Sequence, residues 1–347
     1  MRPTLARCGC AVDIHAHMVP HDFPAYLGGA APAHWPTMAP AHACHRHVMI
    51  DGKNYRTVSD KCWSTDKRLA DFDDMGLGLQ VISPMPELLS YWLKPSDGAQ
   101  LVRYLNEQIA LMVSEAPGRL LGLGAVPLQD MDLALKELHH LRHGLGLSGV
   151  EIGSNIQGVP IGDPRLAPFF EACEALDLAV FVHALRPTGM DRLVGPAPLQ
   201  QVLAYPSDVG LAAASALTGN LMHRHPRLRI AFSHGGGTLA LLLPRLEQAM
   251  SVFPALRDSV MSSPTEQARS FFFDTLVFDG PTLQHLVGCF GASQLMIGTD
   301  YPFNFHEPRP LDRIVQAGYD EAVTQQLVQT NALRFLGLPA TFMNALP

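Results

Sequence analysis

Two histidines at alternate positions, His15 and His17, follow an apolar run near the start of the chain, in the stretch VDIHAHMVP. Polar residues also end three later apolar runs: His183 in LAVFVHAL, His234 in LRIAFSHGGG and Asp300 in SQLMIGTDYP. Imidazole nitrogens and carboxylate oxygens are ligands for Zn²⁺ and similar divalent ions. If these runs end at the same edge of the fold, the sequence predicts a metal site there.

The chain has 16 histidines, and several of them need no functional explanation. Solvent or a helix face accounts for His42, His45, His47, His139, His140 and His143, and a single histidine at the end of a strand is more often structural. Recurrence at the ends of four separate runs favours the metal site over this alternative, because the active sites of α/β barrels gather at one end of the strands.

The fold must bring those ends together. Short apolar runs alternate with helix-like segments: we expect strands at 12–20, 77–86, 120–128, 149–154, 178–185, 228–237, 270–277 and 293–302, and helices at 99–116, 131–143, 163–177 and 237–250. About eight strands in this order predict an α/β fold of the TIM (β/α)8-barrel type. Side chains at i and i+2 of a strand share a face, so His15 and His17 can both enter the mouth of the barrel. An open doubly wound sheet is the alternative, but the G-x-G-x-x-G turn typical of that fold is not found after the first strand.

We expect residues 1–347 to form a single metal-dependent barrel domain, with a small inserted subdomain at about 19–65, after the first strand. Within it, residues 28–47 are rich in Pro, Ala and His and predict an irregular excursion. Residues 47–58 alternate about Asp51-Gly52, which predicts a hairpin.

The formal net charge of -7 argues against nucleic-acid and anionic-membrane partners, since both require clustered Lys and Arg. A small-molecule partner fits better. Six scattered cysteines favour free thiols, and the N-terminus lacks the long apolar region of a signal peptide, so we expect a cytoplasmic protein.

Five stretches carry a family resemblance: VDIHAH, FVHA, FSHGGGTLALLLPRLE, IGTDYPF and NYRTVSDKCWSTDKRLADFDDMG. From about residue 10 to the C-terminus the chain resembles the metal-dependent decarboxylases of the amidohydrolase superfamily, and within them the group like 2-amino-3-carboxymuconate 6-semialdehyde decarboxylase. The resemblance implies that His15, His17, His183 and Asp300 bind one Zn²⁺ ion, or another divalent metal, without an organic cofactor. It also implies that His234 hydrogen-bonds a metal-bound water and acts with Asp300 in acid/base catalysis.

The resemblance further assigns substrate contacts. Arg56, in the inserted hairpin, and Arg245, in LLLPRLE, match arginines that hold the substrate, because a guanidinium pairs well with a carboxylate. In the family the second arginine reaches the site of a neighbouring subunit, which implies a homodimer. Trp63 also matches a family position. Each of the three has a simpler reading: solvated surface for the arginines and core packing for Trp63.

Three departures from the family leave the substrate open. A Pro-Trp pair is missing after His183, where this chain reads HALRPTGM, and a family arginine falls near Phe253, which leaves Arg186 and Arg257 as candidate replacements. Glu151 stands where the family has an amide. It is either a hydrogen-bond partner of a ligand histidine or a ligand of a second metal.

The leading hypothesis is a Zn²⁺-dependent, non-oxidative decarboxylase of a small unsaturated or aromatic carboxylic acid with an amino or hydroxyl substituent. The alternative is a metal-dependent hydrolase of a cyclic amide, a lactone or a related compound. A third possibility is a barrel that only binds or scaffolds, which the fold alone does not exclude.

Overall fold

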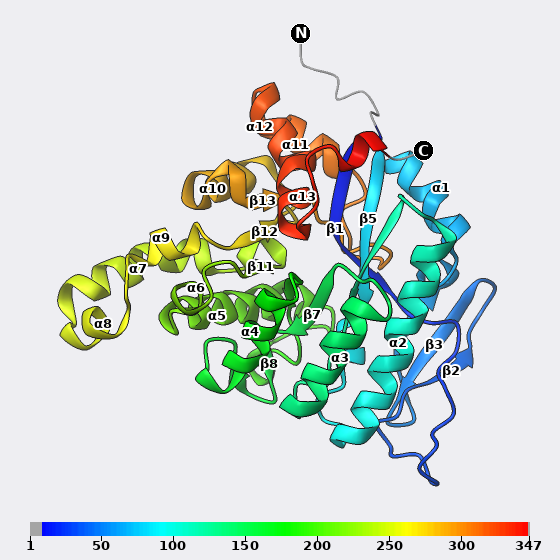
Figure 1. Ribbon diagram of the computed structural model, residues 1–347. Helices are drawn as coiled ribbons and strands as arrows, with labels where there is room; N and C mark the ends of the chain where they lie inside the picture. The colour runs from blue at the N-terminus through cyan, green and yellow to red at the C-terminus, as the bar shows by residue number, and fades with distance from the viewer. Residues whose placement is uncertain (1–8, 346–347) are drawn as a thin grey trace.

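The computed structural model describes residues 9–345, and its centre is a sheet of eight parallel strands (Figure 1). Their order in the sheet is the order in the sequence: β1 (Ala11–Met18), β5 (Leu77–Pro84), β6 (Leu120–Gly124), β7 (Gly149–Gly153), β10 (Ala179–His183), β11 (Arg229–Phe232), β12 (Phe272–Asp274) and β13 (Leu295–Met296). Two parallel bridges, Asp13 to Ile297 and Ala16 to Tyr301, join β1 to the segment after β13. The predicted TIM barrel is therefore confirmed.

Helices follow the strands and cover the outside of the sheet (Figure 1). They are α1 (Thr65–Met75), α2 (Pro95–Glu115), α3 (Met131–His143), α4 (Ala167–Ala175), α5 (Tyr205–Thr218), α6 (Leu221–Arg224), α7 (Leu239–Val252), α8 (Pro254–Ser259), α9 (Pro264–Ala268), α10 (Gly280–Phe290), α11 (Pro310–Ala317), α12 (Glu321–Gln325) and α13 (Asn331–Leu336). In α2 the buried Leu101, Leu105, Ile109 and Met112 recur at intervals of three or four residues, which is the spacing that lays one helix face on a sheet. Helices α7 and α8 project from the barrel at the left of Figure 1.

One irregularity in β1 decides which of its side chains face inward. Val12 and Ile14 belong to the same buried cluster as Leu79 and Phe181, yet His15 also contacts the Phe181 ring, with centroids 4.9 Å apart. The register between β1 and β5 shifts between Asp13 and Ala16. A bulge of this kind adds one residue to the alternation and redirects the side chains that follow. It lets β1 contribute apolar residues to the barrel core and histidines to its mouth.

A three-stranded antiparallel sheet lies between β1 and α1 in the sequence: β2 (Thr37–Pro40), β3 (His45–Ile50) and β4 (Lys53–Ser59). The predicted hairpin is confirmed, with positive φ at both Asp51 and Gly52, as a tight two-residue turn requires. The prediction of an irregular excursion was wrong at β2. Pro36 and Pro40 flank or end this strand, and an edge strand tolerates proline because one row of its backbone donors has no partner. The single domain and its insertion at 19–65 remain predictions.

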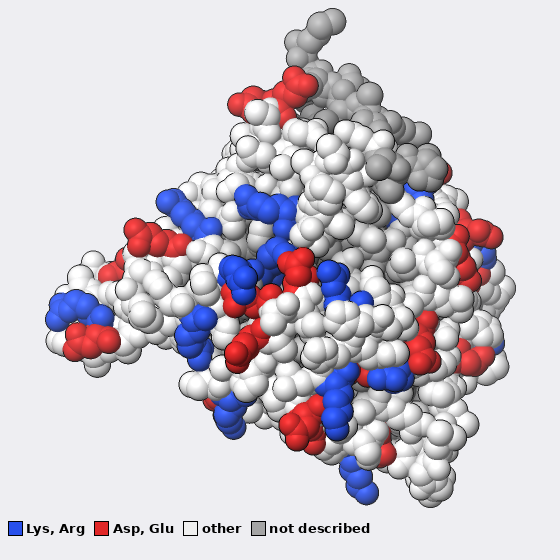
Figure 2. Space-filling model, in the orientation of Figure 1, with Lys and Arg blue, Asp and Glu red and all other residues white. Residues whose placement is uncertain are grey.

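Four cysteines are free, as expected (Cys44, Cys62, Cys173 and Cys289), but Cys10 is disulfide-bonded, so the expectation was wrong there. Cys8 lies outside the described residues. Within residues 9–345, the helices lack the apolar length that crossing a bilayer would require. Basic and acidic side chains are interspersed on the face shown in Figure 2.

Candidate metal centre

The two histidines of β1 present unprotonated nitrogens to one another. Nδ1 of His15 lies 2.7 Å from Oδ2 of Asp274, and Nδ1 of His17 lies 3.1 Å from the carbonyl oxygen of Pro84. Each contact places the ring proton of a neutral imidazole on Nδ1 and leaves a lone pair on Nε2. The two Nε2 atoms are 3.2 Å apart. Facing lone pairs at this distance repel unless a cation lies near both of them.

His183 completes the arrangement from across the barrel, and Asp300 completes it from the segment after β13, next to β1. His183 is the last residue of β10, and its Nδ1 lies 2.9 Å from the carbonyl oxygen of Ala184. Its Nε2 and the Oδ1 atom of Asp300 are buried and have no hydrogen-bond partner within the described chain. Oδ1 of Asp300 lies 3.1 Å from Nε2 of His17 and 3.7 Å from that of His15. Asp300 follows β13 by four residues, and its backbone N–H donates to the carbonyl of His15, so hydrogen bonding to β1 fixes its place.

His234 begins the turn that follows β11. His234, Gly235, Gly236 and Gly237 all have positive φ, which only glycine adopts without strain. A Cβ atom on Gly237 would lie 1.9 Å from the carbonyl oxygen of Pro206. The SHGGG motif is therefore required for a tight turn that leaves the His234 side chain half-buried at the mouth.

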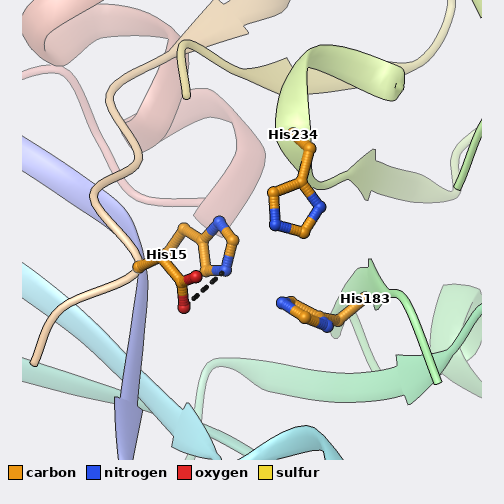
Figure 3. A group of neighbouring side chains, drawn as sticks. His15, His183 and His234 are labelled. Carbon is orange, nitrogen blue, oxygen red and sulfur yellow. Dashed lines mark ion pairs between the residues drawn. The ribbon is translucent and has the colours of Figure 1, made fainter. Parts of the chain in front are cut away.

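These side chains converge on one space. Figure 3 shows His15, His183 and His234 pointing toward one another, and ring centroids in this trio lie 5.0 to 5.4 Å apart. One ligand atom from each of His15, His183, His234 and Asp300 lies within 4.8 Å of the others. Burial lowers the pKa of His15, His17 and His234 to about 3, so all three are neutral at pH 7 and able to offer lone pairs. Orphaned nitrogens and a carboxylate oxygen in one buried space fit a divalent cation.

Asp274, at the end of β12, is a site residue that the sequence analysis missed. Besides Nδ1 of His15, its carboxylate accepts the backbone N–H groups of His234 at 2.9 Å and Gly235 at 2.7 Å. One buried carboxylate thus holds two of the site histidines. A local signal was present, because Asp274 directly follows three phenylalanines in SFFFDTLV, as His183 directly follows the apolar residues of LAVFV.

A second missed network supports β1 from outside the barrel. The Asp13 carboxylate accepts hydrogen bonds from Gln80 at 2.7 Å and from the Thr299 hydroxyl at 2.6 Å. The fully buried Arg68 donates to Gln80 at 2.7 Å and to the carbonyl of His17 at 2.6 Å. These contacts link β1 to β5, to α1 and to the segment that carries Asp300.

Glu151 is fully buried on β7, next to the site. Its Oε2 accepts a hydrogen bond from Ser83 and lies 3.7 Å from Nδ1 of His17, while Oε1 has no partner within the described chain. Burial raises the pKa of Glu151 well above its usual value. The group of possible metal ligands found among residues 9–345 does not include Glu151.

A cavity of about 260 Å³ opens on His234 and Asp300. Its other walls are mostly apolar and include Leu276, Val277 and the stacked rings of Phe278 and Phe305. An adjoining cavity of about 550 Å³ shares Phe305 and is lined by the first predicted substrate arginine, Arg56. The Arg56 guanidinium lies 4.3 Å from the centre of the Phe303 ring, and that ring stacks on His17.

The other residues predicted to contact the substrate do not line these two cavities. Arg245, on α7, and Arg257, on α8, are exposed on the projecting helices. The Arg186 guanidinium lies 3.1 Å from the centre of a Trp92 ring and 2.9 Å from a carboxylate oxygen of Glu87, which neutralises its charge. Trp63 packs against the apolar cluster under the inserted sheet, 5.5 Å from the His21 ring.

Two curated relatives resemble the chain over most of its length. The 2-amino-3-carboxymuconate-6-semialdehyde decarboxylase of Dictyostelium discoideum is 36% identical over 332 residues, which cover 94% of this chain and 91% of the relative. The enzyme of the same name from Caenorhabditis elegans is 24% identical, with 94% of each chain covered.

Three solved structures share the fold. The apo form of IDCase from Metarhizium anisopliae superposes with a TM-score of 0.80, at 22% identity, over 94% of this chain and 97% of that one. The 5-carboxyvanillate decarboxylase of Sphingomonas paucimobilis gives 0.71 at 26% identity, over 80% and 84%. A dihydroxybenzoic acid decarboxylase from a Polaromonas species, solved with bound manganese, gives 0.73 at 18% identity, over 94% and 97%.

The family model of the amidohydrolases matches residues 12–338, which include every histidine and carboxylate of the site described above. The chain therefore belongs to the amidohydrolase family, among its decarboxylase-type members.

Proposed function

We propose that this protein is a metal-dependent, non-oxidative decarboxylase of a small aromatic or unsaturated carboxylic acid with an amino or hydroxyl group next to the carboxylate. One observation carries the proposal: Nε2 lone pairs of His15, His17 and His183 and the Asp300 carboxylate meet at the mouth of the barrel, beside an apolar cavity. The activities named for the relatives support it.

The metal would be one Zn²⁺ ion held by His15, His17, His183 and Asp300, and the bound cation would supply positive charge that orients oxygens of the substrate. Manganese in a structural relative makes that metal the main competitor. His234 would then stand beside the ligands. Its neutral ring, within the same cluster, suits a group that exchanges a proton with the substrate.

The chain's own residues account for the remaining steps. Arg56 would hold the carboxylate at the edge of the cavity, because its guanidinium lies beside the His17 and Phe303 rings. His234 or Asp300 would take up a proton from solvent or from the bound water and deliver it to the carbon that bears the carboxylate. The bond between that carbon and the carboxylate then breaks, its electron pair restores conjugation, and CO2 leaves. The balance is one proton consumed for each CO2 released.

The charge of Arg186 affects how many carboxylates the substrate can carry. Since Glu87 already neutralises this guanidinium, Arg186 offers little attraction for a second carboxylate. We therefore favour an acid with a single carboxylate over the dicarboxylate implied by the name of the two curated relatives described above.

A homodimer is part of the proposal. Leu241 and Val252 of α7 and the adjacent Phe253 are exposed apolar residues on the projecting helices, as Arg245 is. A second copy that covered them would bring its Arg245 toward a neighbouring site. A cytoplasmic location also remains a proposal.

A hydrolase is the second candidate, because Oε1 of Glu151, which has no partner among residues 9–345, offers a carboxylate oxygen for another metal ion. The metal content separates the two: about one ion per chain favours the decarboxylase, and two ions that both depend on Glu151 favour the hydrolase.

The test is to incubate metal-loaded protein with amino- and hydroxy-substituted benzoates and muconate-type acids, and to follow CO2 together with ring or diene absorbance. The proposal predicts CO2 in a one-to-one ratio with product for at least one acid. Hydrolysis of a lactone or cyclic amide in a parallel panel, without CO2 from any acid, would overturn it.

A further inference from the structure

His183 is held differently from the other two histidines proposed as ligands. Nδ1 of His15 contacts the carboxylate of Asp274, and Nδ1 of His17 contacts a carbonyl oxygen at the end of β5. Nδ1 of His183 donates instead to the carbonyl of the next residue, Ala184, at 2.9 Å. The direction of that carbonyl therefore decides which ring nitrogen of His183 carries the proton and where Nε2 points.

One peptide bond joins the Ala184 carbonyl to a hydrogen-bond network. The Ala184 carbonyl and the Leu185 N–H belong to the same planar peptide unit, so a contact that fixes one of them also fixes the other. The Leu185 N–H donates to the hydroxyl of Ser154 at 3.0 Å. The Ser154 N–H donates to the carbonyl of His183 at 2.7 Å. Ser154, which directly follows β7, therefore holds the chain on both sides of Ala184.

Asp208, on α5, sets the direction of the Ser154 hydroxyl. The hydroxyl donates its one proton to Oδ2 of Asp208, which leaves its lone pairs to face the Leu185 N–H. Oδ1 of Asp208 accepts the backbone N–H of Thr188 at 3.0 Å. The Asn155 amide lies 3.4 Å from Oδ2 and donates to the Leu185 carbonyl at 2.9 Å. The buried Asp208 carboxylate is thus the centre of the network that holds the loop after His183.

The loop has a backbone conformation that needs such support. Arg186 has a φ of 43°, in the left-handed region that is unfavourable for a residue with a Cβ atom. A residue keeps this conformation where the surrounding structure restrains it. Hydrogen bonds to the backbone of Leu185 and Thr188, on either side of Arg186, supply that restraint.

The position of Asp208 is itself tied to the site. In the first turn of α5, the carbonyl of Pro206 accepts the Thr238 N–H at 3.2 Å. Thr238 directly follows the glycines of the SHGGG turn that carries His234. The first turn of α5 therefore contacts both the loop after His183 and the turn that carries His234.

We propose that Asp208 is a positioning residue for the metal ligand His183: by accepting the Ser154 hydroxyl, it fixes the peptide unit whose carbonyl holds the His183 ring. The inference rests on the proposed function, in which His183 is a ligand.

Asp208→Asn keeps the size of the side chain but introduces an NH2 group. Facing Thr188, this group opposes another donor, and facing Ser154, it turns the hydroxyl proton away toward the Leu185 N–H. In either orientation the loop loses a hydrogen bond, and the Ala184 carbonyl loses its fixed direction.

The test measures metal affinity and stability separately. Zinc affinity is measured by competition with a chelating dye, and the free energy of unfolding of the metal-free protein by urea, for the wild type, Asp208→Asn and Ser154→Ala. Each variant should bind zinc about tenfold more weakly, at the lower end of the range for residues that support a metal ligand. The matched control is Asp191→Asn, an exposed aspartate of the same connection between β10 and α5, which should change neither quantity.

A spectroscopic readout distinguishes positioning from general support of the fold. In metal-free protein with isotope-labelled histidine, long-range proton–nitrogen correlation spectra report the tautomer of each ring, and His183→Gln identifies the signals of His183. The ring should carry its proton on Nδ1 in the wild type and populate both tautomers in Asp208→Asn. A ring that keeps the Nδ1 tautomer in Asp208→Asn would contradict the inference.

Double variants test the route of the effect. Asp208→Asn and Ser154→Ala act through one peptide unit, so together they should weaken zinc binding about as much as either does alone. Asp208→Asn and Asp274→Asn support different ligands, so their fold losses should multiply. Losses that multiply in the first pair would overturn the inference.

Unchanged zinc affinity in Asp208→Asn would also overturn it, even with a lower free energy of unfolding, because the network would then support only the fold. If Asp208→Asn does not fold, Ser154→Ala decides the question in the same way. If affinity falls in both variants but no acid releases CO2, the inference stands and the proposed function fails. If CO2 is released and neither variant alters affinity, the proposed function stands and the inference fails.

Discussion

Oδ2 of Asp274 lies 2.7 Å from Nδ1 of His15, and the same carboxylate accepts the backbone N–H groups of His234 and Gly235. The carboxylate fixes the His15 proton on Nδ1 and so turns the lone pair of Nε2 toward the metal centre. The turn that carries His234 is anchored on the same atoms. Strand β12 thus positions the site although none of its residues is a proposed ligand.

Asp274→Asn tests this relationship. The amide keeps the size of the side chain but removes the negative charge that holds the His15 proton. We expect metal affinity to fall about 10- to 100-fold, as when a hydrogen-bond partner of a ligand histidine is lost. Competition with a chelating dye measures the affinity. Asp132→Asn, on the exposed face of α3, is the matched control and should leave it unchanged. Unaltered affinity in Asp274→Asn would contradict the role assigned to Asp274.

The ligand set gives a second prediction. His15→Ala and His17→Ala should lose bound zinc, whereas His234→Ala should keep close to one ion per chain and lose turnover. Elemental analysis of the purified variants measures this, with circular dichroism to verify folding. The distances also group His234 with His15, His183 and Asp300. If His234→Ala loses zinc and His17→Ala keeps it, the ligands are His15, His183, His234 and Asp300 instead.

Subunit mixing tests the proposed dimer. Arg245→Met and Asp300→Asn should each be inactive alone, because one lacks the arginine given to its neighbour and the other lacks a residue of its own site. Random mixed dimers should recover about a quarter of wild-type turnover, since half of the dimers are mixed and each restores one of its two sites. Mixed dimers that form but show no turnover would exclude a contribution of Arg245 across subunits.

Arg68 supports the barrel from a buried position, and its removal should be costly. Arg68→Met would leave Gln80 and the backbone carbonyls of His17 and Lys61 without their donor. We expect the free energy of unfolding to fall by about 3 kcal/mol. Urea unfolding measures it, and Arg192→Met, at an exposed position, should change it little. A loss below that of the control would show that these contacts contribute little to stability.

The barrel and the convergence of His15, His17, His183, His234 and Asp300 were predictable from the sequence. Each of these residues ends or follows an apolar run, and parallel strands present those ends at one edge. The bulge in β1 was not predictable. Strict alternation would put either Val12 and Ile14 or His15 and His17 inside, whereas the structure turns both pairs inward.

Asp274 and Arg68 were missed for a different reason. Their partners are far away in the sequence: Asp274 holds His15 across 259 positions, and Arg68 donates to the carbonyl of His17 across 51. The local sequence pattern predicts which face of a strand or helix a residue occupies, but it does not predict which distant residue its side chain contacts. Of the two, only Asp274 had a local signal, which was its position at the end of a strand.

The most direct test of the central claim is turnover of an accepted acid in D2O, with the product examined by mass spectrometry and NMR. Loss of CO2 with protonation should give a product with one deuterium, placed on the carbon that carried the carboxylate, and metal removal should abolish it. A product that retains its carboxylate and gains oxygen from solvent would contradict decarboxylation and favour hydrolysis.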